Sequence, residues 1–324
     1  MTAAKLDPRE ESFLIPGPRD GLSLFLRFLP AQPDRPCQGV VLYVHGATFP
    51  PALSIAHRFD GRSWRDELSA AGFHVWGLDF HGFGRLSDPY PEMEAPATDH
   101  PPLGRAHDAS LQLEQAARFI RDHHHVARLS IVAHSWGSIV AGRFAGRCAD
   151  LMERLVLFGP IARRETAPEA TEAPAWRLIT IEDQWKRFVV DVPAGRPPVL
   201  LRRHFEEWAE CYLDTDPESR RRCPAAVKVP AGPFRDVAEA WAGSFPYDPG
   251  LITCPVAILR GEWDSLCDDR DARWLFDALS NAALRRDVKI SGATRLMHLE
   301  SSRHALYRET EAFLQGRDMI PAPA

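Results

Sequence analysis

The sequence has no apolar run that approaches the roughly 18–20 residues of a membrane-spanning helix. The first eleven residues carry five charged side chains and no apolar stretch, so we expect no secretory signal. An excess of basic charge is also missing, with 39 Lys and Arg against 44 Asp and Glu. This charge balance argues against nucleic acid as a partner.

Closely spaced cysteine pairs are absent as well. The six cysteines are scattered and none forms a CxxC motif: Cys37, Cys148, Cys211, Cys223, Cys254 and Cys267. They indicate reduced thiols in the cytoplasm, with no disulfide framework and no zinc site. We expect no metal and no organic cofactor, and a small molecule as the partner; a homodimer is compatible with the sequence.

Proline, by contrast, is abundant, with 28 residues in 324. Eleven of them lie between Ile161 and Gly250, and five more between Pro89 and Pro102. The prolines are mixed with Trp and Leu, which argues against disorder. The clusters therefore predict long, shaped insertions in an otherwise regular fold.

Apolar runs alternate with helical patterns along most of the chain. The runs predict strands over Leu22–Phe28, Gly39–Val44, His74–Asp79, Leu129–Ala133, Leu155–Phe158, Val256–Arg260 and Val288–Ile290. Helical spacing predicts helices over Arg62–Ala71, Arg105–His125, Ser138–Cys148, Arg270–Leu279 and Ser302–Leu314. This alternation is typical of an α/β protein with a parallel sheet covered on both faces. We expect the first of these strands to be antiparallel.

The regular alternation stops over residues 161–249, which contain four of the nine tryptophans. A structureless loop of this length is uncommon inside a compact domain. We therefore predict a small helical cap here, with helices within Val199–Leu213 and Arg235–Ala242. The predicted domains are a core of residues 1–160 and 250–324 and an inserted cap of residues 161–249.

Ser135 lies between a predicted strand and a predicted helix, in the sequence Ala-His-Ser-Trp-Gly. Small residues two positions to either side, Ala133 and Gly137, are what a nucleophile elbow requires, because the serine occupies a tight and strained turn. The start of a helix also offers unpaired backbone N–H groups. Ser135 is therefore the predicted nucleophile.

A serine nucleophile needs a base, and the base needs an acid to orient it. Asp264 and His298 each follow a predicted strand, so both are expected at the sheet edge where Ser135 lies. They are the predicted acid and base. Glu262 is the alternative acid, and His304, which falls within the closing helix, is the alternative base.

With these motifs, the sequence resembles an α/β-hydrolase-fold serine hydrolase with an inserted cap domain. The resemblance covers about Leu22 to Leu314 and implies a mostly parallel eight-stranded sheet with helices on both faces. Tyr43-Val-His-Gly-Ala47 is similar to the family's His-Gly motif. In the family, backbone N–H groups at the positions of Ala47 and Trp136 form the oxyanion hole.

The resemblance implies acyl transfer to water without a cofactor. We predict hydrolysis of an ester-type bond in a small, largely apolar substrate through an acyl-enzyme on Ser135. Thioesterase, C–C bond hydrolase and prolyl-aminopeptidase-like activities stay open as alternatives, and so does a protein that binds a small molecule without turnover.

Overall fold

The computed structural model describes residues 6–165 and 173–317. Their main feature is an eight-stranded mixed sheet in the order β1-β2-β4-β3-β5-β6-β9-β10. The strands are β1 Glu11–Pro16, β2 Ser23–Leu29, β3 Gly39–Val44, β4 Phe73–Asp79, β5 Leu129–His134, β6 Met152–Phe158, β9 Val256–Gly261 and β10 Arg285–Ile290. β2 pairs antiparallel with both β1 and β4, whereas the remaining pairs are parallel. The carboxyl ends of β3, β5, β6, β9 and β10 therefore share one edge.

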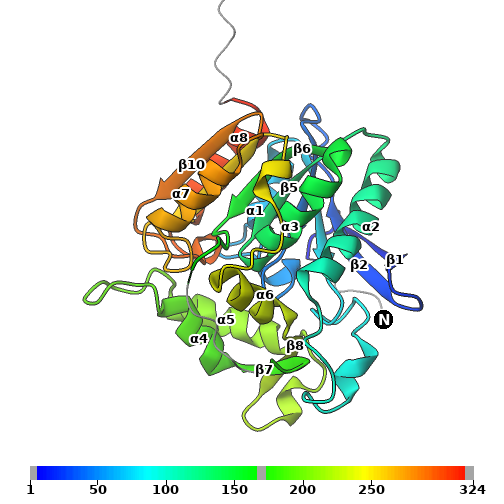
Figure 1. Ribbon diagram of the computed structural model, residues 1–324, viewed down its shortest axis with the longest axis vertical. Coiled ribbons are helices and arrows are strands. Elements are labelled where there is room, and N and C mark those ends of the chain that lie inside the picture. The colour runs from blue at the N-terminus through cyan, green and yellow to red at the C-terminus, as the bar shows by residue number, and fades with distance from the viewer. Residues whose placement is uncertain (1–5, 166–172, 318–324) are drawn as a thin grey trace, which may run out of the picture.

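Helices cover both faces of this sheet (Figure 1). They are α1 Trp64–Ala70, α2 Ala106–His124, α3 Trp136–Arg147, α7 Asp269–Ala278 and α8 Arg303–Leu314. Apolar side chains of α1 and α8 pack on one face, and those of α2, α3 and α7 pack on the other. A capping box between Ser63 and Asp66 starts α1, and Gly72, with a φ of 97°, follows its end.

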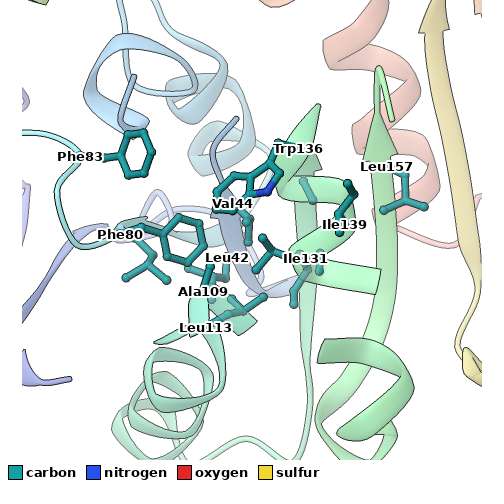
Figure 2. Close-up of a cluster of buried hydrophobic side chains, with 14 of the residues drawn as sticks. Leu42, Val44, Phe80, Phe83, Ala109, Leu113, Ile131, Trp136, Ile139 and Leu157 are labelled. Atoms are coloured by element: carbon teal, nitrogen blue, oxygen red, sulfur yellow. The ribbon is translucent and has the colours of Figure 1, made fainter. Parts of the chain in front are cut away.

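The core beneath the edge at Ser135 is densely apolar (Figure 2). Leu42 and Val44 of β3 and Ile131 of β5 contribute buried side chains. Trp136 and Ile139 of α3 join the same cluster, and all five side chains are fully buried. The start of α3 is thus held rigidly against the sheet.

Between β6 and β9 the chain leaves the sheet and builds a separate layer at the carboxyl edge, with residues 166–172 of the predicted cap outside the described range (Figure 1). This inserted layer contains β7 Trp176–Thr180, α4 Ile181–Val189, α5 Arg202–Leu213, β8 Ala226–Pro230 and α6 Gly232–Trp241. β7 and β8 form an antiparallel pair. None of the helices in the described ranges is long and apolar enough to cross a membrane.

The predicted α/β fold with a mostly parallel eight-stranded sheet is confirmed. The inserted layer differs from the prediction, because it contains a two-stranded sheet in addition to helices. β1 was also not predicted; it is an edge strand with a mainly exposed burial pattern, so its apolar signal is weak. The division into two domains stays a prediction.

Candidate active site

Ser135 occupies a strained turn between β5 and α3. Its φ of 55° and ψ of −123° lie outside the regions that non-glycine residues ordinarily adopt. The Ser135 N–H donates to the Phe158 carbonyl at 2.9 Å, which ties the turn to the neighbouring strand. A Cβ on Gly137 would lie 2.4 Å from the His45 carbonyl oxygen, so this position accepts only glycine. The residue types predicted for an elbow are thus explained by close backbone contact.

The two residues predicted to form the oxyanion hole, Ala47 and Trp136, line the cavity that Ser135 faces. Ala47 follows β3 and Trp136 is the first residue of α3. Within the described residues, neither backbone N–H donates a hydrogen bond. Two unpaired donors beside a serine are suited to stabilising a developing oxyanion.

The cavity lies between the carboxyl edge of the sheet and the inserted layer and has a volume of about 580 Å³. This is within the size range of small-molecule sites. Its described lining is mostly apolar, with four charged side chains: Ala47, Ser135, Trp136, Ile161, Arg177, Arg187, Val190, Asp191, Pro233, Phe234, Val237, Ala238, Trp241, Ser265, Leu266 and Arg295.

The side chain in direct contact with the serine is Arg295. Its Nη2 donates a hydrogen bond to the Oγ of Ser135. Arg295 is only 6% exposed, and burial lowers the pKa of its guanidinium. An arginine keeps its proton in proteins, so Arg295 donates to the serine and accepts nothing from it. Sequence reasoning missed this residue, although it lies in the same loop as His298.

Asp264 follows β9 and lies at the same edge. Its Oδ1 accepts from the backbone N–H of Leu266 at 2.9 Å and from that of Cys267 at 3.1 Å. Its Oδ2 is buried without a hydrogen-bond partner. Burial raises the pKa of Asp264 to about 6, although the positive charge of Arg295 acts in the opposite direction.

His298 is 1% exposed and lies in a short 3-10 turn, Met297–Leu299. Neither ring nitrogen has a hydrogen-bond partner, so His298 is bonded to neither Ser135 nor Asp264. Its ring instead packs on aromatic rings, with centroid distances of 4.7 Å to His134 and 5.2 Å to Phe158. Burial lowers the pKa of His298 to about 3. The predicted chain of hydrogen bonds from acid to base to nucleophile is therefore not assembled.

The alternative acid and base lie outside this arrangement. Glu262 faces solvent, where it accepts from the Ser291 hydroxyl at 2.7 Å and the Gly292 N–H at 2.8 Å. His304 is on α8, and its ring packs edge-on against Tyr307 at 5.8 Å. Neither side chain lines the cavity that Ser135 faces.

A buried carboxylate connects the inserted layer to the elbow. Asp236 of α6 accepts from the indole N–H of Trp136 at 2.9 Å and from the Ala106 N–H at 2.7 Å. The same carboxylate pairs with Arg105 at 2.5 Å. Burial raises the pKa of Asp236, whereas these donors lower it. The inserted layer is thereby fixed to α2 and α3.

Comparison with known proteins gives the family of the chain. The family model described as serine aminopeptidase, S33, matches residues 36–309. The chain belongs to this family of α/β-hydrolase serine hydrolases. No curated protein matches it.

Solved structures of a serine hydrolase and of esterases resemble it over nearly the whole chain. A serine hydrolase from Cycloclasticus zankles has a TM-score of 0.62 and 16% identity, over 96% of this chain and 100% of that one. An esterase from Exiguobacterium antarcticum has a TM-score of 0.60 and 14% identity, over 93% and 98%. A thermophilic esterase from Thermogutta terrifontis has a TM-score of 0.56 and 17% identity, over 95% and 100%. At these identities the likeness concerns the fold.

Proposed function

We propose that this member of the S33 family hydrolyses an ester-type bond of a small, largely apolar substrate through an acyl-enzyme on Ser135. The observation that carries the proposal is the strained elbow conformation of Ser135, at φ 55°, beside a cavity of about 580 Å³. Such strain persists only where surrounding structure imposes it, and it is common at reactive residues.

The proposed reaction has two steps. Oγ attacks the carbonyl carbon of the ester, the tetrahedral oxyanion is held by the N–H groups of Ala47 and Trp136, and the alcohol leaves with a proton. Water then attacks the acyl-enzyme and releases the carboxylic acid together with the free Ser135 hydroxyl. In the described conformation the Oγ proton passes to water, while the guanidinium of Arg295 stabilises the alkoxide by charge and hydrogen bond.

In this proposal, the predicted catalytic roles of Asp264 and His298 depend on a change of conformation at Arg295. His298 is uncharged at neutral pH because its pKa is about 3, so its imidazole has a lone pair that could accept a proton. It would act as the base only in a conformation in which Arg295 leaves the Oγ of Ser135. Asp264 would then orient the imidazole.

One observation favours a second function, which is binding of a small molecule without turnover. The group that hydrogen-bonds the serine hydroxyl is a guanidinium, and a guanidinium cannot act as a general base at neutral pH. Ester hydrolysis stays the preferred function because the strained turn at Ser135 and the unbonded N–H groups of Ala47 and Trp136 support it.

A fluorophosphonate probe tests the nucleophile directly. Wild-type protein should be labelled, and Ser135→Ala should not be. Ser301→Ala, at an exposed serine outside the cavity, is the matched control and should be labelled like wild type. Turnover of a panel of p-nitrophenyl esters that disappears in Ser135→Ala supports hydrolysis. Ligand binding with no turnover above that of Ser135→Ala supports the second function.

A further inference from the structure

Two arginines face the Ser135 cavity without forming an ion pair to a described carboxylate. Arg295 contacts Ser135, and Arg187 projects from α4 of the inserted layer. Within the described residues, neither guanidinium has a carboxylate within 4.0 Å. Buried charges in proteins ordinarily form close ion pairs, so two guanidinium groups at one cavity that lack one need an explanation.

Neutral groups of the protein fix the position of Arg187. Its Nη1 donates to the Thr48 hydroxyl at 2.7 Å and to the Gln184 amide oxygen at 3.1 Å. Thr48 directly follows Ala47, so the positive charge of Arg187 lies next to the predicted oxyanion hole. Burial and the charge of Arg295 lower the pKa of Arg187 to about 10, which leaves it cationic at neutral pH.

The negative charges of Asp264 and Asp191 act on Arg295, although neither carboxylate lies within ion-pair distance of it. Asp191 is the one carboxylate among the described lining residues, and its Oδ1 accepts a hydrogen bond from the Ser265 hydroxyl at 2.5 Å. Arg177 adds a third positive charge at the cavity, where its guanidinium lies 4.8 Å from the Phe234 ring centroid. Among the described lining residues, three positive charges therefore face one negative charge, with Asp264 as a further carboxylate that acts on Arg295 from behind the lining.

We infer that the Ser135 cavity recognises an amphipathic anion, whose carboxylate lies between Arg187 and Arg295 and whose apolar body contacts the inserted layer. A planar guanidinium fork matches a carboxylate in geometry and charge. Phe234, Val237 and Trp241 provide the apolar surface. This inference deepens the proposed function, on which it rests: the ester would carry a carboxylate, or the bound species would be the carboxylic acid product.

Calorimetry with octanoate and with octanamide tests the inference on the full chain without any turnover. Wild-type protein should bind octanoate at least tenfold more tightly than octanamide, which has the same chain but no charge. In Arg187→Gln this preference should fall to less than threefold, whereas Arg187→Lys should retain part of it. Arg203→Gln, at an exposed arginine of α5, is the matched control and should keep the wild-type preference.

Each outcome separates the inference from the proposed function. Equal binding of octanoate and octanamide by wild type overturns the inference. So does an unchanged preference for octanoate in Arg187→Gln, provided that this variant has the melting temperature of wild type. If Arg187→Gln is poorly folded, the inference is tested by two other measurements: the preference of wild type for octanoate over octanamide, and the partial retention of that preference in Arg187→Lys. Octanoate preference without fluorophosphonate labelling overturns only the hydrolase proposal, and labelling without any anion preference overturns only the inference.

Discussion

The guanidinium of Arg295 donates a hydrogen bond to the hydroxyl of Ser135, from the loop that follows β10. In a Ser-His-Asp triad, a histidine occupies this place between the nucleophile and the acid. Here the same contact delivers a positive charge and no proton acceptor. This exchange of a guanidinium for an imidazole beside Ser135 determines how each substitution at the site should change the rate of turnover.

Replacing this arginine with histidine should accelerate turnover. Arg295→His puts a proton acceptor where the guanidinium now contacts Ser135, and general base catalysis contributes about 10²–10⁴-fold. We expect kcat for p-nitrophenyl acetate to rise on the order of 10²-fold. Arg295→Gln, which removes the charge without adding a base, is the control. Equal rates for the two variants would exclude a base at this position.

The contribution of Asp264 should depend on its neighbour. In wild type no histidine is bonded to Asp264, so Asp264→Asn should lower kcat by less than about tenfold. In the Arg295→His background the same change should cost on the order of 10³-fold, because the carboxylate then orients an imidazole. A double-mutant cycle on the p-nitrophenyl acetate rates measures this difference. Additive effects would show that Asp264 and residue 295 act independently.

The pH profile should distinguish the two arrangements. His298, with a pKa of about 3, does not titrate near neutral pH, so no rate plateau should arise from it. If the Ser135 proton passes to water or hydroxide, log kcat of wild type should rise steadily between pH 6 and 9. Arg295→His should instead reach a plateau near pH 7, as its imidazole loses its proton. A wild-type plateau near pH 7 would indicate a titrating base that the described contacts do not include.

The contribution of Asp79 to stability should fall as pH rises from 4 to 7. Asp79 is 2% exposed, and burial raises its pKa to about 7 from 3.8. In that window the folded state keeps a proton on Asp79 that the unfolded state has released, so the contribution of this group to the free energy of unfolding decreases with pH. The slope from this group is at most about 1.4 kcal/mol per pH unit.

Asp79→Asn should remove this part of the dependence and be more stable than wild type at pH 8. Urea unfolding at pH 5, 6, 7 and 8 measures both effects. Asp34→Asn, at an exposed position, should follow the wild-type curve. Parallel curves for Asp79→Asn and wild type would show that Asp79 is already ionised in the folded protein at acidic pH.

Removing the Asp236 carboxylate should destabilise the protein. Asp236→Ala leaves the indole N–H of Trp136 and the N–H of Ala106 without their acceptor. Loss of one partner from such a buried group costs about 3 kcal/mol. Glu239→Ala, which breaks a more exposed pair with the same Arg105, should cost less than about 1 kcal/mol. Urea unfolding of the two variants gives the comparison.

The residues that sequence reasoning found are those set by local structure. Ser135 was identifiable because an elbow needs small neighbours within two residues, and the close contact of Gly137 with the His45 carbonyl shows why. Gly39–Val44 was identifiable as a buried strand from its continuous apolar run, and it is β3 without change. Both signals depend on a few consecutive residues.

Long-range contacts account for what was missed. Arg295 and His298 share one loop after β10, and sequence alone does not tell which side chain faces Ser135 and which packs against Phe158. Arg187 was missed for a different reason. Its helix α4 is short and begins with a capping box between Thr180 and Asp183, in a segment where the regular alternation had ended.

Trp136 has two contacts that link separate parts of the molecule. Its indole N–H donates to Asp236 of the inserted layer, while its backbone N–H is one of the two donors of the proposed oxyanion hole. A ligand that shifts α6 would therefore act on the side chain of the residue that provides this donor. Recognition of the substrate's remote portion and stabilisation of charge at the reacting carbonyl are thus mechanically coupled, as induced fit requires. A ligand whose remote portion does not fit the inserted layer would then bind with the Trp136 N–H displaced from the reacting carbonyl.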